Sequence, residues 1–243
     1  MSGHTSSARQ LAALTRRFGL PASSQAGFHA LLTLLTEDPL APTTIRDPDQ
    51  ALRDHLADAL VALELPEIRA AGTLADLGAG AGVPGLPLAI AQPQTTVFLL
   101  ESNRRKCDFI VRAAEAAGAT NAIVVPARAE NWAEGIGHCD VVTARALAPL
   151  AVVAEYAAPL LRDGGVLIAW RGRRDSAEET AAAAAAAQLG LRYEPPVEVR
   201  PHSGATHRHL QRLVKVAPTP ERFPRRAGMA RKRPLGSPRA TGI

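Results

Sequence analysis

A glycine-rich stretch between an apolar strand pattern and an apolar helix pattern constrains the fold of this chain most strongly. It runs from Asp76 to Gln92, reads DLGAGAGVPGLPLAIAQ, and contains four glycines and two prolines. Because glycine has no Cβ and tolerates positive φ, such a loop lets the backbone approach a ligand closely. The N-terminus of the helix behind the loop favours polar ligand groups. The stretch therefore predicts a ligand-binding turn after a first strand.

Short apolar runs alternate with helix-like stretches from about residue 72 onward. The pattern predicts strands at 73–77, 96–100, 122–125, 140–144 and 166–170. It predicts helices at 85–91, 103–117 and 149–161. Each predicted helix follows a strand at the short spacing of a right-handed βαβ crossover, so we expect a doubly wound α/β sheet.

The segments on either side of this alternating region have different patterns. Residues 1–70 contain leucines at helical spacing, which predicts an N-terminal helical cap. An alanine-rich run at 178–189 predicts a further helix, and the segments 195–201 and 209–216 predict an antiparallel ribbon at one sheet edge. We expect three parts, namely a cap over 1–70, a ligand-binding domain over 71–217 and a basic tail over 218–243.

The positive charge of the chain is concentrated at its C-terminus. The chain has 243 residues and a net charge of +5, and residues 218–243 contain seven basic residues and one acidic residue. Such a tail gains affinity for a polyanion by releasing counterions from phosphates, although a solvated tail with no partner has the same composition. The sequence predicts a polyanion partner or a solvated tail.

Other classes of protein find little support in the composition. The two cysteines are too few for a disulfide framework, and no cluster of histidines, cysteines and acids predicts a metal site. No apolar run reaches the length of a membrane span, and the first residues lack the pattern of a secretory signal. We expect a cytoplasmic protein without a membrane segment or a bound metal.

The glycine loop alone does not identify its ligand. Residues 80–85 satisfy the spacing of a dinucleotide fingerprint, and Glu101 at the next strand end can accept hydrogen bonds from ribose hydroxyls. Asp76 precedes Gly78 by two residues, where its carboxylate repels a pyrophosphate and can meet a cationic ammonium group. This arrangement favours S-adenosylmethionine (SAM), and an NAD-dependent oxidoreductase stays open as the alternative.

A second stretch supports the same choice of ligand. The residues PLLRDGGVLIA at 159–169 resemble the helix, Gly-Gly turn and fifth strand of class I SAM-dependent methyltransferases. The predicted ribbon also resembles their antiparallel last strand, whereas most dinucleotide-binding folds continue in parallel. The resemblance implies a Rossmann-like doubly wound sheet with an antiparallel last strand, to which the leucine spacing adds the N-terminal helical cap.

A closer resemblance extends over residues 45–235. The segments ADLGAGAGVPGLPLAIAQP, LLES, NRRKCDFI, ARAENWA, VVTARALAPL and PRRAGMARKRPL occur in this order. They resemble the bacterial ribosomal small-subunit methyltransferase G family, also called the glucose-inhibited division protein B family. The resemblance implies methyl transfer from SAM to N7 of a guanine in the 530 loop of 16S rRNA, position 527 in standard rRNA numbering. It also implies a small ribosomal subunit or assembly intermediate as partner, and we expect a monomer.

The residue pattern and the resemblance together predict the site. The expected cofactor-binding residues are Asp76, Gly78, Gly80, Gly82, Val83, Glu101, Ala129, Glu130 and Arg145. Arg145 is also the expected catalytic residue, because strand ends line the ligand crevice and its donors can orient guanine or phosphate; a surface ion pair is the alternative. For His55, a hydrogen bond within the protein and an RNA contact both stay open. The expected RNA-binding residues are Arg171, Arg173, Arg225, Arg226, Arg231, Lys232 and Arg233.

The implied reaction needs no side chain that removes a proton. Guanine N7 has an exposed lone pair and no proton, so its attack on a sulfonium methyl group needs no general base. Proximity and orientation can supply about 7–11 kcal/mol of such a barrier at best. The sequence is consistent with such a reaction. It contains neither the Asn-Pro-Pro-aromatic motif used to methylate exocyclic amines nor the Pro-Cys nucleophile used to methylate pyrimidine C5.

Two positions depart from the pattern of the family. Residues 41–43 are Ala-Pro-Thr where the family usually has Asn-Leu-Thr, and Arg171-Gly172 stands where many members have Lys-Gly. An arginine presents a planar fork of donors instead of a point charge, so the geometry of a phosphate contact changes. These departures leave the target and the activity open, and a non-catalytic protein that binds RNA or the ribosome stays an alternative.

Overall fold

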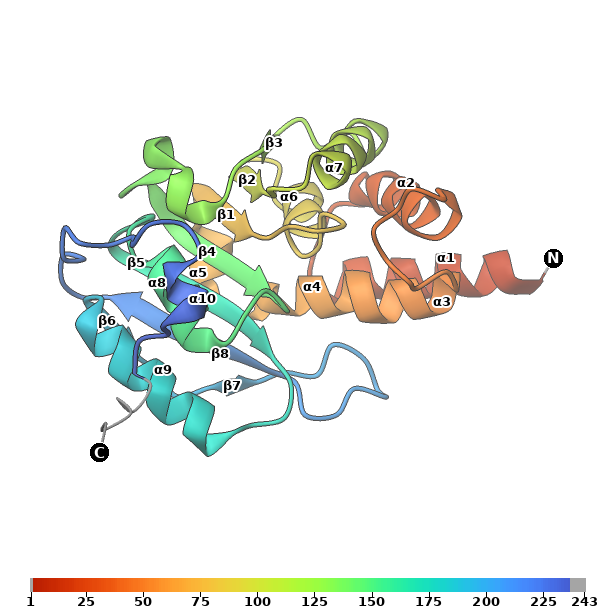
Figure 1. Cartoon of the computed structure of the whole chain (residues 1–243). Coiled ribbons are helices and arrows are strands. Elements are labelled where there is room, and N and C mark those ends of the chain that lie inside the picture. The colour runs from red at the N-terminus through yellow and green to blue at the C-terminus, as the bar shows by residue number, and fades with distance from the viewer. Residues whose placement is uncertain (1, 237–243) are drawn as a thin grey trace.

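A central sheet between two layers of helices organises the chain (Figure 1). The computed structural model describes residues 2–236, and only the backbone of residues 2–7. The strands are β1 (Thr73–Leu77), β2 (Thr96–Leu100), β3 (Ala122–Val125), β4 (Cys139–Arg145), β5 (Leu161–Arg171), β6 (Leu191–Tyr193), β7 (Val197–Glu198) and β8 (His209–Lys215). Their order is β3-β2-β1-β4-β5-β8-β6, and β7 pairs with β8.

The helices account for most of the remaining chain. They are α1 (Ser2–Arg17), α2 (Ser24–Glu37), α3 (Pro48–Ala51), η1 (Leu52–Ala57), α4 (Asp58–Leu60), η2 (Val61–Glu64), α5 (Pro66–Ala70), α6 (Gly85–Ala91), α7 (Arg104–Ala116), η3 (Ala129–Asn131), η4 (Ala133–Gly135), α8 (Leu150–Ala157), α9 (Ser176–Gln188) and α10 (Met229–Lys232). The segment η1 is one π-helical turn, and η2, η3 and η4 are 3₁₀ turns.

The predicted sheet is confirmed. The strands β1 to β5 are parallel, and β8 runs antiparallel between β5 and β6. The ribbon of β7 and β8 is present, with Val197 opposite Leu210. Some boundaries differ. The helix predicted at 149–161 ends at Ala157, and β5 begins at Leu161 and not at residue 166. Leu161 pairs with Cys139 across an irregular register.

The two faces of the sheet bury alternate residues of each central strand, as the strand period requires. Leu74, Val141 and Ile168 belong to a hydrophobic cluster with α6, α7 and the cap, which is residues 2–70. Ala75 and Val142 belong to a second cluster, with α8 and α9. Each face therefore has its own core.

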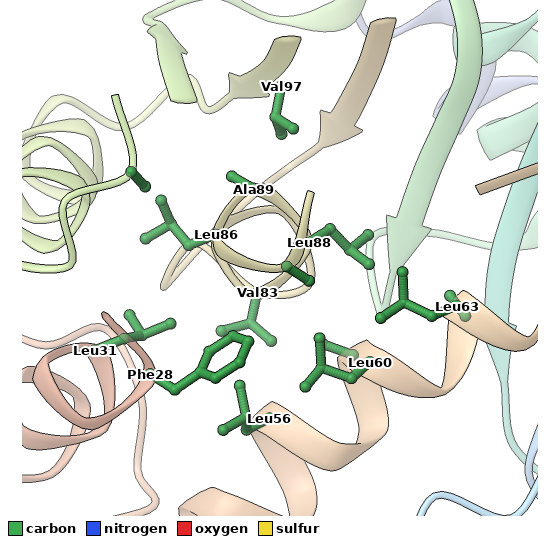
Figure 2. Packing of buried hydrophobic residues seen from close by; sticks show 14 of the residues in the cluster. Phe28, Leu31, Leu56, Leu60, Leu63, Val83, Leu86, Leu88, Ala89 and Val97 are labelled. Atoms are coloured by element: carbon green, nitrogen blue, oxygen red, sulfur yellow. The ribbon is translucent and has the colours of Figure 1, made fainter. Parts of the chain in front are cut away.

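The cap completes the first of these faces. The helices α6 and α7 contact β2 and β3, and the cap covers the neighbouring part of the face. Figure 2 shows Leu88 of α6 facing Leu60 and Leu63 of the cap. Trp170 of β5 donates a hydrogen bond from Nε1 to the carbonyl oxygen of Asp58 at 2.7 Å. The cap is thus part of the same core as the sheet, and the predicted boundary at residue 70 stays a proposal.

The described part of the basic tail packs on the opposite face. Phe223 and Ala230 are buried in the second cluster, and Arg225 donates to the carboxylate of Glu155 in α8, with Nε to Oε1 at 2.7 Å. These residues join the described part of the tail to α8 and the second cluster. The predicted tail also includes residues 237–243, which lie outside the described residues.

The shared core predicts the effect of removing one side chain between the cap and the sheet. Leu60→Ala lowers the free energy of unfolding by about 2–5 kcal/mol, since the side chain of Leu60 is fully buried. Leu40→Ala changes it by less than about 0.5 kcal/mol, because Leu40 is 70% exposed. Urea unfolding followed by circular dichroism measures both. Two separate transitions, of which Leu60→Ala moves only one, would contradict a shared core.

Candidate functional site

A cavity of about 570 Å³ opens at the carboxyl ends of β1 and β2 and beside the segments that follow β3 and β4. The order of the sheet reverses between β1 and β4, and ligands of open α/β sheets bind at such a switch point. The volume lies within the range of small-molecule sites. The lining residues are Leu77, Gly78, Leu100, Glu101, Ser102, Lys106, Ala127, Arg128, Ala129, Glu130, Ala146, Leu147, Tyr156 and Arg231. We refer to this cavity as the cofactor cavity.

Asp76 supports the glycine loop from inside the protein. Its carboxylate is fully buried and accepts hydrogen bonds from the Gly85 amide and the Thr143 hydroxyl, both at 2.9 Å. Burial raises the pKa of this carboxyl to about 7, against the lowering effect of these two hydrogen bonds. A Cβ at Gly85 would lie 2.2 Å from the Leu99 side chain, so only glycine fits here. Asp76 does not line the cavity, which differs from the expectation that it meets the cofactor.

Gly78 is the loop residue closest to the cavity. Its φ is +66°, and a Cβ there would lie 2.6 Å from Leu147, which also lines the cavity. The expected contacts of Gly80, Gly82 and Val83 find less support, since none of these three residues lines the cavity. Figure 2 shows the side chain of Val83 pointing toward the cap, into the first hydrophobic cluster.

Glu101 follows β2 and lies at the wall of the cavity. The side chain is buried, and its two oxygens accept from the amides of Asn103 at 2.8 Å and Gly80 at 3.2 Å. Each carboxylate oxygen can accept a further hydrogen bond, so the group can also hold ribose hydroxyls. Ala129 and Glu130 line the cavity from η3, as the resemblance implies. The arrangement fits a ligand that carries a ribose.

The sequence analysis missed part of the lining. Lys106 of α7, Arg128 and Tyr156 of α8 line the cavity and were not predicted. Arg231 was expected to contact RNA, but it lines the cavity and donates to the Leu147 carbonyl at 3.0 Å. The tail is also tied to Glu130, which accepts from the Gly228 amide at 3.2 Å. No local pattern reports these contacts, because they join segments that are far apart in sequence. The cavity thus contains both carboxylates and cations, which suits the ammonium and carboxylate groups of SAM.

Arg145 ends β4 and binds the cap. Its Nη1 donates to the Asp58 carboxylate at 3.0 Å and to the Asp54 carbonyl at 2.9 Å. Its Nη2 lies 3.3 Å from Nδ1 of His55, whose Nε2 lies 2.9 Å from the Thr43 hydroxyl. The alternative for Arg145 was a surface ion pair, and the ion pair observed with Asp58 is partly buried, with the two side chains 20% and 10% exposed. The catalytic and cofactor-binding roles of Arg145 stay predictions. Arg145 does not line the cofactor cavity, whereas the next residue does.

His55 sits in the π-helical turn η1, a feature that often marks functional sites. Burial, followed by the charge of Arg145, lowers the pKa of His55 to about 4. The imidazole is therefore neutral near pH 7. Its two nitrogens are occupied by Arg145 and Thr43, which is the first of the two alternatives for this residue.

The predicted RNA-binding residues occupy different environments. Arg171 pairs with Glu178, and Arg225 pairs with the buried Glu155, so both charges are compensated within the protein. Arg173 lies at a second cavity, described below. Arg226, Lys232 and Arg233 are exposed.

Among residues 2–236 no group of three potential metal ligands occurs, and none of the helices in that range is long and apolar enough to cross a membrane.

The buried carboxyl of Asp76 predicts a specific pH dependence. Its pKa in the folded protein, about 7, is above the ordinary value of 3.8, so the folded state binds this proton more tightly. The stability from this group is fully present below about pH 4 and is lost as the pH rises through about 7. Asp76→Asn cannot ionise, so the stability of the wild type relative to this variant falls between pH 4 and 7. Urea unfolding at a series of pH values measures the difference, and a difference that does not change with pH contradicts the prediction.

Comparison with known proteins identifies the family. The model of the family described as rRNA small subunit methyltransferase G matches residues 31–210. A ribosomal RNA small subunit methyltransferase G from Chloroflexus aggregans is 38% identical over 244 residues, which cover 97% of this chain and all of the relative. That from Rubrobacter xylanophilus is 42% identical over 196 residues, which cover 78% of this chain and 75% of the relative.

Solved structures show the same fold. A SAM-dependent methyltransferase from Aquifex aeolicus matches with a TM-score of 0.53 and 16% identity, over 70% of this chain and 94% of that one. The predicted fold class is thereby confirmed. The family model and both relatives extend over most of the chain. This chain therefore belongs to the rRNA small subunit methyltransferase G family.

Proposed function

We propose that this protein transfers the methyl group of SAM to N7 of a guanine in the 530 loop of 16S rRNA, acting in the cytoplasm as a monomer. The family membership makes it a SAM-dependent methyltransferase of small-subunit rRNA. The proposal rests above all on the cofactor cavity, which lies at the switch point of the sheet with Gly78 and Glu101 in its wall. An NAD-dependent oxidoreductase, the earlier alternative, finds no support in the family.

The lining of the cavity assigns roles to particular groups. Glu101 would hold the ribose hydroxyls, while the η3 segment at Ala129 and Glu130 would lie near the adenine. Gly78 leaves room for the ligand because it has no Cβ, and Leu147 and Tyr156 line the same cavity. When bound, SAM supplies a methyl carbon on a positively charged sulfur. No residue has to remove a proton, because N7 of guanine carries none.

Arg145 has donors left for an acceptor base. A guanidinium has five N–H groups. Three of them face Asp58, Asp54 and His55 in this structure. The remaining donors, at Nε and Nη2, are available to guanine or to a phosphate beside it. Because Asp58 fixes the guanidinium, we propose that Arg145 orients the acceptor and does not hold the cofactor.

The first test measures methyl transfer and its product. Purified protein is incubated with tritiated SAM and either naked 16S rRNA or the assembled small subunit, and the digested RNA is analysed for N7-methylguanosine. Glu101→Gln weakens SAM binding roughly tenfold, since a hydrogen bond to a charged group contributes about 1.5–3 kcal/mol. Glu37→Gln, on the exposed end of α2, leaves it unchanged. Methylation at another atom, or RNA binding without transfer, contradicts the proposal.

A second test addresses Arg145. Arg145→Ala lowers kcat for rRNA roughly tenfold or more, because the acceptor loses a charged donor, while the Kd for SAM changes less than about twofold. The control is Arg112→Ala, which also removes an arginine from an ion pair, here with Asp38 at 2.9 Å on the cap side. Calorimetry and single-turnover methylation separate the two effects. Full activity of Arg145→Ala would remove this residue from the site.

A further inference from the structure

A second cavity of about 680 Å³ lies on the same edge of the sheet as the cofactor cavity. Its lining residues are Gly172, Arg173, Arg174, Pro196, Glu198, Val199, Arg200, Ala205, Thr206, His207, Arg208 and His209. They follow the carboxyl end of β5 and belong to the hairpin of β7 and β8. We call this cavity the arginine cleft.

The two cavities are neighbours. The strand β5 pairs in parallel with β4, so their carboxyl ends meet at one edge, with Arg145 opposite Trp170. Adjacent strands lie about 4.8 Å apart. The segment after β4 lines the cofactor cavity, and the segment after β5 lines the arginine cleft. A chain-like ligand can therefore occupy both at once.

The charge of the cleft is predominantly positive. Four of its lining residues are arginines, and Glu198 is its one acidic lining residue. Arg174 is paired with Glu179 at 2.7 Å, and Arg208 reaches Asp58 at 3.5 Å. The exposed side chains of Arg173 and Arg200 have no ion pair or hydrogen bond with any residue in 2–236. Uncompensated cations in a concave surface attract a polyanion.

The cleft is held in shape by the cap. Arg17 of α1 donates to the carbonyl oxygens of Pro201 at 2.7 Å and Arg200 at 2.8 Å. Within the hairpin, the Val199 amide donates to the Arg208 carbonyl at 3.0 Å. The wall is thereby fixed before any ligand binds, which reduces the ordering cost of binding.

Two further features connect the cleft with the reaction site. Asp58 contacts both Arg145, through Oδ2, and Arg208, through Oδ1, so one carboxylate joins the strand end to the cleft wall. Ala146 and His207 are the non-glycine residues with positive φ in the described chain, at 54° and 52°. One lines each cavity. Strained backbone of this kind clusters at ligand sites.

We propose that the arginine cleft binds the phosphodiester backbone of the RNA strand that carries the methylated base, next to that base. Arg173 and Arg200 contact the phosphates, and the strand continues past Arg145 so that the base reaches the cofactor cavity. The inference rests on the proposed function and adds to it the surface that positions the strand. Phosphate contacts of this type fix register and contribute affinity without reading sequence.

The test removes the two unpaired guanidinium groups together. Arg173→Ala/Arg200→Ala is compared with Arg162→Ala/Arg192→Ala, which removes two exposed arginines from the opposite end of β5 and its neighbourhood. We expect the first variant to raise KM for 16S rRNA at least tenfold while kcat changes less than threefold. The control variant changes neither. Calorimetry with S-adenosylhomocysteine gives the same Kd for all proteins, and thermal unfolding verifies that both variants fold.

A binding measurement tests the cleft without any methyl transfer. The Kd for a fluorescein-labelled single-stranded oligoribonucleotide is measured by anisotropy at several salt concentrations. The slope of log K against log salt changes by about 0.7 per phosphate contact of a single strand. For two lost phosphate contacts, the magnitude of the slope therefore falls by about 1.4 in Arg173→Ala/Arg200→Ala, and it stays unchanged in the control. An unchanged slope and KM would overturn the inference, even if the wild type methylates rRNA. Conversely, the wild type could fail to transfer methyl groups while Arg173→Ala/Arg200→Ala still shows the smaller slope. That result would contradict the proposed function but would support RNA binding by the arginine cleft.

Discussion

A parallel sheet has to be covered on both faces, and this requirement explains the arrangement of the whole chain. The helices α6 and α7 cover one face beside β2 and β3, and α8 and α9 pack on the other. The part of the first face that α6 and α7 leave uncovered is buried by the cap, whose residues share a core with Ile168 and Trp170. The cap therefore contributes to the core of the sheet, and it also brings Asp58 to Arg145 at the carboxyl end of β4.

The glycine loop is supported by a carboxylate that does not line the cofactor cavity. Asp76 is buried below the loop and fixes the start of α6 through the Gly85 amide, while Glu101 holds the loop from the cavity side through the Gly80 amide. Asp76 thus holds the backbone of the loop, and Glu101 can still accept further hydrogen bonds at the cavity. These two carboxylates have different roles because Glu101 lines the cavity whereas Asp76 does not, and burial raises the pKa of Asp76.

Ion pairs inside the protein compensate the charges of some of the arginines that were predicted to bind RNA. Arg171 and Arg225 have carboxylate partners in α9 and α8, and Arg231 lines the cofactor cavity. Arg173 and Arg200 have no such partner among residues 2–236, and they lie together in the arginine cleft although they come from different segments. The number of basic residues along the chain predicts an RNA-binding surface at the tail. The unpaired arginines at the sheet edge instead come from the end of β5 and from the hairpin of β7 and β8.

The pattern of the sequence was enough to predict the parallel sheet, the antiparallel β8 and the positions of Gly78 and Glu101 at strand ends. Its resemblance to a known family implied the family and the positions of Ala129 and Glu130, which also line the cavity. These features depend on local patterns, namely apolar periodicity, glycine spacing and residues directly after strand ends, which a chain displays in order. Only the folded structure shows that Asp76 is enclosed, that Arg145 pairs with Asp58, and that Arg231 of the tail lines the cofactor cavity. Each of these three features depends on contacts between segments that are distant in sequence and on the charges that meet there. The local spacing of residues therefore cannot predict them.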